Sequence, residues 1–304
     1  MTSDRTLAAA ALIIAYATII GFTDNFVTLI ARNAGLWQFH ATRSAMGIAI
    51  LLAVSALSGL RLRPRRMRGV VARSAVHGAA MMLYFGSLAF LTVAQVAAGL
   101  FTAPIFVLLI SRFVYGEPIG GARVLAVVTG FAGALLVLGP AALHGATVAA
   151  FLPVVAGALY AMGNIATRKW CEGENAGTLV GGFFVALGLF GIIGMAVLTV
   201  WPLPVPVGPS GFAVRGPVVP DGAFWLWTFV QAAGSLLAVS LMIRAYQISD
   251  AGRVSVFEYA ILPAAAVWGY VIKSETLTLT AVSGMILIAA AGIVIALTGR
   301  QTTG

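Results

Sequence analysis

Residues 74–111 read SAVHGAAMMLYFGSLAFLTVAQVAAGLFTAPIFVLLIS and contain no Asp, Glu, Lys or Arg. A helix that crosses a bilayer needs roughly 20 mostly apolar residues. This run is therefore long enough for two such helices and the turn that joins them. Residues 124–167 and 175–214 form two further charge-free runs of the same kind. These runs predict that most of this chain is surrounded by lipid rather than water.

The bulk composition supports the same interpretation. Of the 304 residues, 61% are hydrophobic and only 9% are charged, and the mean hydropathy is +1.02. Soluble domains carry about 25% charged residues. The net charge of +9 does not indicate nucleic acid, because the basic residues lie between apolar segments, where they orient a membrane protein. The single cysteine, Cys171, excludes an internal disulfide.

Apolar runs and the breakers between them predict an all-α membrane protein. Ten transmembrane helices fit best. Eight would remain if the first helix or a weakly predicted pair did not cross the membrane. The N-terminus has one arginine before its apolar run and no obvious cleavage site, so we expect a retained first helix rather than a cleaved signal. The proline-rich segment 201–222 is expected to be an external, solvated loop. The ten spans are expected at residues 7–30, 36–59, 70–91, 94–114, 121–139, 147–170, 177–200, 223–245, 253–272 and 277–297.

The distribution of charge orients these helices. With the N-terminus inside, 14 of the 18 basic residues fall in inside segments, among them the six arginines from Arg61 to Arg73. This is a strong positive-inside bias. Arg32, Arg215 and Lys273 fall outside, and Arg43 falls within the second helix. We therefore expect a multi-pass protein of the bacterial inner membrane with both termini in the cytoplasm.

Two short patterns recur in the same order along the chain, and the excess length between the copies lies mostly in the loop 201–222. They are Asn-x-x-Thr at 25–28 and 164–167, and Pro-to-Glu spacings of 13 and 12 at Pro104–Glu117 and Pro263–Glu275. The matches predict two similar halves, residues 1–140 and 141–304. Because each half has five spans, the second copy enters from the opposite side, and the halves are inverted repeats. Inverted halves are a structural basis for alternating access.

The chain resembles the drug/metabolite transporter superfamily, in particular its ten-helix EamA-type members. The stretch that ends at Glu117 is the most specific, and its second copy departs from it, with Ser274 where glycine is usual. The resemblance implies a secondary carrier without a cofactor that exports small metabolites, often amino acids. The stretches that carry it are GFTDNFVT from Gly21, FHATRSAMG from Phe39, APIFVLLISRFVYGEPI from Ala103, ALYAMGNIATRKW from Ala158 and ILPAAAVWGYVIKSETLTL from Ile261.

Polar groups inside predicted helices are the first candidates for a substrate site, because a charged residue at the helix centre costs roughly 2.5–3.5 kcal/mol on insertion scales. Asp24 and Asn25 lie well inside the first helix. Asp24 could meet a substrate amine or carry a proton, or it could form a structural ion pair with Arg43. Arg43 itself could hold a substrate carboxylate, although the structural pair is favoured.

Further candidates lie in the third and ninth predicted helices. His77 and Tyr84 are seven residues apart and share a helix face. Tyr84 offers a hydroxyl and a ring to a substrate, and His77 could titrate near neutral pH or bond a neighbouring helix. Glu258 and Tyr259 precede Pro263, which frees a backbone carbonyl. A carboxylate there suits a gate or a coupling site, and a charge exposed at the lip of the helix is the alternative.

The remaining candidates are weaker. Asn164 and Gln231 could donate hydrogen bonds to a substrate or to neighbouring helices, and Trp268 could line a cavity. Pro104 and Pro263 are expected to act as hinges or gates. The glycines of segment 188–194 predict a helix packing face and not a nucleotide loop, because no strand precedes them and no lysine follows. With no GxxxxGK[ST] pattern and no His/Cys cluster, we expect neither ATP, metal nor another cofactor.

These features predict a secondary or facilitative transporter, not an enzyme. We expect export of small metabolites by alternating access, with amino acids, including aromatic or hydrophobic ones, as the favoured cargo. Another small metabolite or a drug-like compound is the alternative. A membrane enzyme would need clustered acids or histidines, whereas the three histidines are scattered. The expected partners are a small-molecule substrate and the lipid bilayer, without nucleic acid, and the protein is expected to be a monomer or a weak homodimer.

Overall fold

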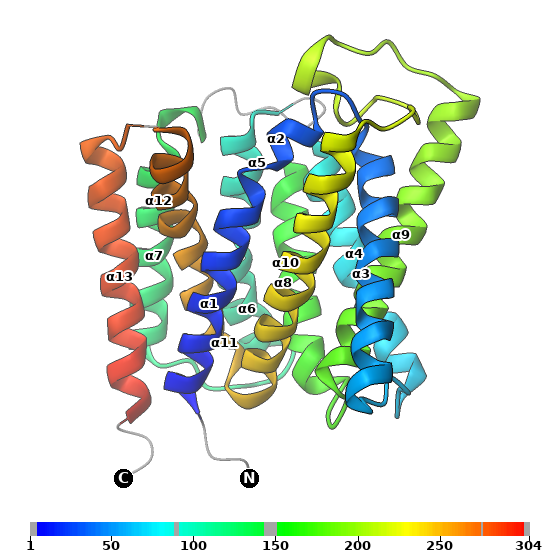
Figure 1. Cartoon of the computed structure of the whole chain (residues 1–304). Coiled ribbons are helices and arrows are strands. Elements are labelled where there is room, and N and C mark those ends of the chain that lie inside the picture. Colours follow the sequence, from blue (N-terminus) through cyan, green and yellow to red (C-terminus); the bar gives the residue numbers. More distant parts are fainter. Residues whose placement is uncertain (1–4, 88–90, 143–150, 275, 301–304) are drawn as a thin grey trace.

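The charge-free runs of the sequence form helices that lie side by side in one bundle (Figure 1). The structure, a computed structural model, describes residues 5–87, 91–142, 151–274 and 276–300. In lipid every backbone N–H and C=O must be bonded within the protein, and a helix achieves this within one segment. The α-helices are α1 Thr6–Asp24, α2 Val27–Ile30, α3 Leu36–Ser58, α4 Met67–Ser87, α5 Val93–Leu100, α6 Ala103–Phe113, α7 Gly121–Leu138, α8 Phe151–Lys169, α9 Ala176–Val200, α10 Gly222–Ile248, α11 Ala251–Phe257, α12 Ile261–Lys273 and α13 Leu279–Arg300. Short 3-10 helices cover Pro140–Ala142 (η1), Gly208–Gly211 (η3) and Glu258–Ala260 (η4).

Eight segments within the described residues are long and apolar enough to cross a membrane. Large aliphatic side chains on their outer surface, such as Leu52, Ile193 and Ile286, are exposed. Lipid tails solvate such groups at no hydrophobic penalty. The chain is therefore a multi-pass membrane protein. The eight segments are Thr6–Ile30, Leu36–Ser58, Val93–Phe113, Gly121–Leu138, Ala176–Val200, Gly222–Ile248, Ala251–Lys273 and Leu279–Thr298.

The first predicted helix is not continuous, which corrects its sequence-based boundaries. It breaks at Asn25, between α1 and α2. The side-chain Nδ2 of Asn25 donates to the carbonyl of Gly21 at 2.7 Å. In a continuous helix the backbone N–H of Asn25 would donate to the carbonyl of Gly21. In this structure the same N–H donates to the carbonyl of Phe22. Competition from an asparagine side chain thus ends the helix.

Two further spans are interrupted just before a proline. Residues 101–102 separate α5 from α6 shortly before Pro104, and the 3-10 turn η4 separates α11 from α12 before Pro263. Proline has no N–H for the carbonyl four residues earlier, and its ring clashes with that carbonyl. The carbonyls concerned belong to Leu100 and Tyr259. The helical ladder therefore breaks immediately upstream of each proline.

Helix pairs join segments that are far apart in the sequence. α7 packs along α13, α3 along α9, α4 along α8, and α1 along α10. Glycine allows the closest of these approaches, since an ideal Cβ on Gly191 of α9 would lie 2.7 Å from the backbone nitrogen of Ala41 in α3. Gly188 and Gly194 face the same helix, at Ser44 and Trp37. The packing face predicted from residues 188–194 is confirmed.

The two ends of the bundle differ in chemistry (Figure 1). We call the end at which α1 begins and α13 ends the basic face, because the arginine-rich segment 61–66 between α3 and α4 lies there. The opposite end carries segment 201–221 between α9 and α10, and we call it the loop face.

Segment 201–221 is a folded cap and not merely the solvated loop that the sequence predicts. Arg215 donates from Nη1 to the carbonyls of Ala31 and Ala34, both at 2.9 Å, and from Nη2 to the carbonyl of Gly208 at 2.8 Å. Phe212 is only 5% exposed and belongs to a small apolar cluster with Leu36 and its neighbours. The cap therefore closes over the α2–α3 turn.

Some predicted boundaries shift or cannot be compared. The third helix was expected at residues 70–91, but α4 begins at Met67 and ends at Ser87. Residues 88–90, the expected start of the sixth helix at 147–150, and Glu275 of the second Pro-to-Glu spacing lie outside the described residues.

Candidate functional site

Five polar side chains from four segments meet inside the bundle, and we call them the inner polar cluster. Each is at most 7% exposed. The cluster lies in the half of the bundle nearer the basic face, because α10 ends two residues after Tyr246 and α11 begins seven residues before Glu258. Its members are Tyr16 of α1, Tyr160 and Asn164 of α8, Tyr246 of α10 and Glu258 of η4.

Glu258 is the charged member of this cluster, and neutral polar groups surround it. Nδ2 of Asn164 donates to its Oε1 at 3.2 Å. The hydroxyls of Tyr160 and Tyr246 face the same carboxyl group. Glu258 is only 4% exposed, so the alternative of a charge at the helix lip is wrong. Burying a charge is costly unless it is paired or hydrogen-bonded, which explains why polar groups converge on it.

A short hydroxyl chain continues from Tyr160. Its hydroxyl donates to Sδ of Met242 at 3.0 Å and lies 3.4 Å from the hydroxyl of Tyr16. Tyr16 and Met242 come from the packed pair α1 and α10, whereas Tyr160 comes from α8. The inner polar cluster therefore ties the first span to the second half of the chain.

Helix α4 borders the inner polar cluster through His77. The His77 ring is buried, with its centroid 4.7 Å from that of Tyr160. One turn earlier, Arg73 is fully buried and donates to Oγ1 of Thr167 and to the carbonyl of Leu179, both at 3.1 Å. The sequence-based charge count had grouped Arg73 with the inside loop charges. The structure corrects this assignment, because Arg73 ties α4 to α8 and α9.

A second group of polar residues lies toward the loop face, and we call it the outer polar cluster: Asp24, Asn25, Tyr84 and Gln231. Nε2 of Gln231 donates to the carbonyl of Thr23 at 2.7 Å and to Oδ1 of Asp24 at 3.2 Å. Tyr84 lies close enough to Asp24 to interact with it electrostatically.

Asp24 does not form the ion pair with Arg43 that the sequence favoured. Arg43 interacts electrostatically with Asp24, but no salt bridge within 4 Å joins the two side chains. Arg43 instead places its guanidinium 5.2 Å from the ring centre of Phe39. Gln231 of α10 is the hydrogen-bond partner of Asp24, because α1 packs along α10.

Four aromatic rings stand beside the outer polar cluster, and we call them the outer aromatic group: Phe22, Phe26, Trp227 and Trp268. Phe26 and Trp227 are stacked, with centroids 4.1 Å apart and planes 7° from parallel. Phe22 contacts Phe26 and Trp268 edge-on, at centroid distances of 5.1 and 5.0 Å.

The two polar clusters differ in accessibility. Asp24 is exposed, and Asn25 and Tyr84 are half-buried. The inner polar cluster is buried throughout. Polar groups that a solute could reach therefore lie toward the loop face in this structure.

Comparison with known proteins shows which family the first part of the chain matches. Residues 7–139 match the EamA-like transporter family. The riboflavin transporter of Brucella anthropi is 26% identical over 88% of this chain and 87% of that protein. Residues 7–139 therefore carry an EamA-like domain, and most of the chain is similar to proteins that are named transporters. The EamA-type resemblance and the expectation that the chain is not an enzyme are confirmed.

Other similar proteins are also named transporters. The riboflavin transporter of Rhizobium johnstonii is 28% identical over 77% of this chain and 70% of its own. An uncharacterized transporter of Helicobacter pylori is 23% identical over 91% and 90% of the two chains. One crystal structure of a protein with 19% identity covers 98% of this chain and 100% of its own, with a TM-score of 0.76. This last likeness concerns the fold alone.

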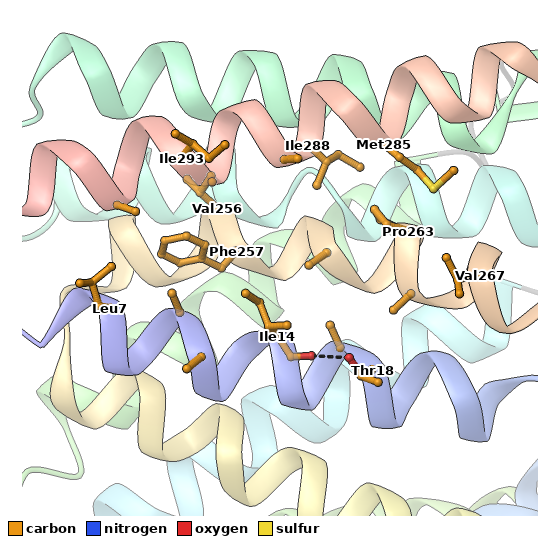
Figure 2. A pocket seen from close by; sticks show the side chains of 18 of the residues that line it. Leu7, Ile14, Thr18, Val256, Phe257, Pro263, Val267, Met285, Ile288 and Ile293 are labelled. Atoms are coloured by element: carbon orange, nitrogen blue, oxygen red, sulfur yellow. Dashed lines mark hydrogen bonds between the residues drawn. The ribbon is translucent and has the colours of Figure 1, made fainter.

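Three predicted site residues, Tyr259, Pro263 and Trp268, belong to neither polar cluster, although the Trp268 ring is part of the outer aromatic group. Tyr259 is fully buried toward α5 and α7, where its ring meets Phe101 and Gly130. Trp268 and Pro263 line an apolar lateral groove of about 810 Å³ between α1, α12 and α13, shown in Figure 2. The structure therefore separates these residues from Glu258 and Asn164.

Sequence reasoning missed the three tyrosines of the inner polar cluster. A usable signal existed for Tyr160, because it lies four residues before Asn164 and so shares its helix face. No local pattern singles out Tyr16 or Tyr246, since their proximity to Glu258 depends on how α1, α10 and η4 pack. Among the described residues, no group of three His, Cys, Asp or Glu side chains could hold a metal ion.

Proposed function

We propose that the whole chain is an EamA-type transporter and that it carries a planar aromatic metabolite of the riboflavin class. The observation that carries the proposal is the outer aromatic group, which stands beside the exposed carboxylate of Asp24 and the amide of Gln231. A flavin ring system is flat, with apolar faces and hydrogen-bonding groups along its edge. Such a ligand needs aromatic surfaces with a few polar groups beside them. The names of the relatives from Brucella and Rhizobium support the same class.

In this proposal the predicted site residues divide between two tasks. Asp24, Asn25, Tyr84 and Gln231 contact the polar edge of the substrate, while Phe26 and Trp227 contact its faces. The deeper residues His77, Asn164 and Glu258 act when the substrate passes toward the basic face. Trp268 and Tyr259 support the walls of the proposed substrate path. Pro104 and Pro263 allow the interrupted spans to bend.

We further propose that the chain has ten spans arranged as two inverted halves, residues 1–140 and 141–304. Helices α4 and α8 supply the two spans beyond the eight that meet the length and hydropathy criteria, and they lie within the bundle (Figure 1). The packing pattern supports a pseudo-two-fold relation, because two of the main contacts of α4 recur for α10 when the halves are exchanged. The contact of α4 with α8 corresponds to that of α10 with α1, and that of α4 with α9 to that of α10 with α3.

The membrane orientation follows from charge. We place the basic face, and with it both termini, in the cytoplasm of a bacterial cell, because arginines favour that side of the inner membrane. The structure would then be open toward the outside, with accessible Asp24 and a buried inner polar cluster. Alternating access requires the opposite state as well, in which the basic face opens.

An amino acid is the second candidate substrate. The observation that favours it is the exposed carboxylate of Asp24 near the outer aromatic group. Among the described residues, Asp24 has no ion-pair partner within 4 Å. It could bind a substrate ammonium group, while the outer aromatic group accepts an aromatic or hydrophobic side chain. Export of such amino acids would use facilitated exchange or proton antiport.

Proteoliposomes that contain the full chain test both candidates. Vesicles loaded with riboflavin are followed by flavin fluorescence, and parallel vesicles contain labelled phenylalanine, tryptophan or leucine. We expect riboflavin flux above that of protein-free vesicles. Amino-acid flux without riboflavin flux would favour the second candidate, and no flux of either would contradict both.

A matched pair of tryptophan variants tests the aromatic contact. Trp227→Ala removes the ring stacked on Phe26, whereas Trp225→Ala removes a tryptophan exposed on the same helix. Aromatic pairs contribute about 0.5–1.5 kcal/mol beyond area burial, so we expect the riboflavin KM to rise about two- to tenfold for Trp227→Ala only. Equal effects of the two variants would argue against the aromatic site.

A further inference from the structure

We propose that the basic face holds a binding site for an anionic phospholipid. The headgroup lies in an arginine-lined pocket, and an acyl chain lies in an adjoining apolar groove. The two hollows share residues 61–67 and the first part of α9. The end of α10 completes the pocket, and α3 and α4 complete the groove. This site is separate from the outer polar cluster and requires no assumption about the transported substrate.

The headgroup pocket has a volume of about 600 Å³ and is strongly basic. Its lining includes Arg61, Arg63, Arg65 and Arg244, all of them exposed. No salt bridge within 4 Å involves these four arginines among the residues that the structure describes. Arginine matches phosphate well, because its planar fork can donate two parallel hydrogen bonds.

One carboxylate shares this lining, and one of its two oxygens already accepts a hydrogen bond. Glu174 is 5% exposed, and its Oε1 accepts the backbone N–H of Arg66 at 2.6 Å. The carbonyl of Glu174 accepts from Nε2 of Gln247 at 2.8 Å. Glu174 therefore anchors the pocket wall, and the four arginines exceed its single negative charge.

The acyl groove has a volume of about 610 Å³ and runs between α3, α4 and α9. Its walls are almost entirely apolar and include Leu52, Val71, Val185 and Ile193, which are exposed on the outside of the bundle. The groove therefore opens on the lipid-facing surface. Its apolar lining suits a hydrocarbon chain.

Residues 61–65 connect the two hollows, because their successive side chains line the pocket and the groove in turn. Arg61, Arg63 and Arg65 line the pocket, whereas Leu62 and Pro64 line the groove. Most of this segment has no helical structure, and successive side chains of an extended backbone point to opposite sides. The segment thus presents charge to one hollow and apolar surface to the other. That division matches an amphipathic ligand better than a free anion.

The position of the site agrees with the proposed occupant. The basic face is the one that the charge distribution assigns to the cytoplasm, and basic clusters at that side attract the anionic lipids of the inner leaflet. A phospholipid in the bilayer would reach the groove laterally, with its phosphate at the height of the arginines. The proposal therefore commits to a lipid from the surrounding leaflet.

Native mass spectrometry of the delipidated full-length protein tests the proposal, with phosphatidylglycerol compared with phosphatidylcholine. We expect selective retention of phosphatidylglycerol. Each arginine near an anionic lipid contributes roughly fivefold to binding, so Arg63→Gln/Arg244→Gln should weaken retention about thirtyfold. The control Arg68→Gln/Arg112→Gln removes two exposed arginines of the same face that line neither hollow, and retention should be unchanged.

A second pair of variants tests the groove independently of charge. Ala75 lines the groove and Ala72 does not, although both are exposed on α4. Ala75→Trp should lower phosphatidylglycerol retention, and Ala72→Trp should leave it unchanged. Equal loss in a site variant and its control would overturn the proposal, as would competition by soluble glycerol phosphate at the concentration effective for phosphatidylglycerol. Because lipid binding is read directly, the result does not depend on riboflavin transport.

Discussion

Asn164 donates a 3.2 Å hydrogen bond to Glu258, from a helix in the middle of the chain to the interrupted turn of a span near its end. Both side chains are almost fully buried. Neutral partners, rather than a cation, stabilise this carboxylate. Glu258 can therefore exchange a proton without breaking an ion pair, and we place any proton coupling at this residue.

Glu258→Gln tests this role. Glutamine keeps the size of glutamate and can accept the Asn164 hydrogen bond, but it cannot ionise. We expect transport to continue while its rate loses dependence on an imposed pH gradient. Initial rates in proteoliposomes across a pH series provide the measurement. Glu117→Gln, which removes a carboxylate paired with Lys169 at the basic face, should keep the wild-type pH profile. An unchanged profile in Glu258→Gln would remove this residue from the coupling mechanism.

Asn164→Ala should destabilise the protein, because it leaves a buried carboxylate without one donor. Removing a partner from a buried polar group costs about 1–3 kcal/mol. Unfolding temperatures in detergent measure the effect for Asn164→Ala, Glu258→Gln and the double variant. The loss caused by Asn164→Ala should be smaller when Glu258 is already Gln. Fully additive effects would mean that the two side chains do not interact energetically.

Gly163→Ala tests the packing of α4 on α8. A Cβ at this position would collide with Nδ1 of His77. Overpacking of this kind typically costs about 1–3 kcal/mol, so the unfolding temperature should fall. Gly86→Ala is the matched control, since no neighbouring atom lies within 4 Å of its added Cβ. It should be neutral or slightly stabilising, because alanine favours a helix more than glycine does. A neutral Gly163→Ala would show that the two helices are less tightly packed than described.

Arg215→Ala should loosen the cap on the loop face. The variant loses the hydrogen bonds to the carbonyls of Ala31, Ala34 and Gly208. We expect a loss of about 2 kcal/mol, since hydrogen bonds to charged groups contribute roughly 1.5–3 kcal/mol each and this side chain is partly exposed. Limited proteolysis of segment 201–221 and thermal unfolding provide two readouts. Arg32→Ala, at an exposed arginine of the same face, should resemble wild type; a comparable loss there would point to charge rather than these bonds.

Asp24→Asn separates the two candidate substrates. A neutral flavin loses at most one hydrogen bond with the substitution, so its KM should change less than about tenfold. An amino acid whose ammonium group meets Asp24 would lose a charge pair, and its transport should fall much further. Parallel flux measurements with riboflavin and phenylalanine decide between them. No effect on either substrate would place Asp24 outside the binding site.

Several features of the fold were predictable because they depend on local chemistry. Charge-free runs longer than a bilayer span predict membrane helices. Pro104 and Pro263 mark interrupted spans, since a missing N–H breaks the helical ladder wherever it occurs. The break at Asn25 was less predictable, because an asparagine bonds its own backbone in some contexts and not in others. The cap at 201–221 was also hard to predict. Its proline content indicated a solvated loop and gave no sign of the contacts that Arg215 makes with distant residues.

The amino-acid sequence was enough to predict a helical chain that spans a membrane and resembles EamA-type transporters, because bilayer thickness and backbone hydrogen bonding leave few alternatives for such apolar runs. Which polar groups meet became visible in the packed helix bundle. It gave Asp24 the partner Gln231 rather than Arg43, brought Tyr16, Tyr160 and Tyr246 to Glu258, and turned Tyr259 away. Apolar helices in lipid have no hydrophobic drive toward one another, so close packing and interhelical hydrogen bonds select their neighbours. Those selections depend on pairs of residues far apart in the chain, and no local pattern contains them.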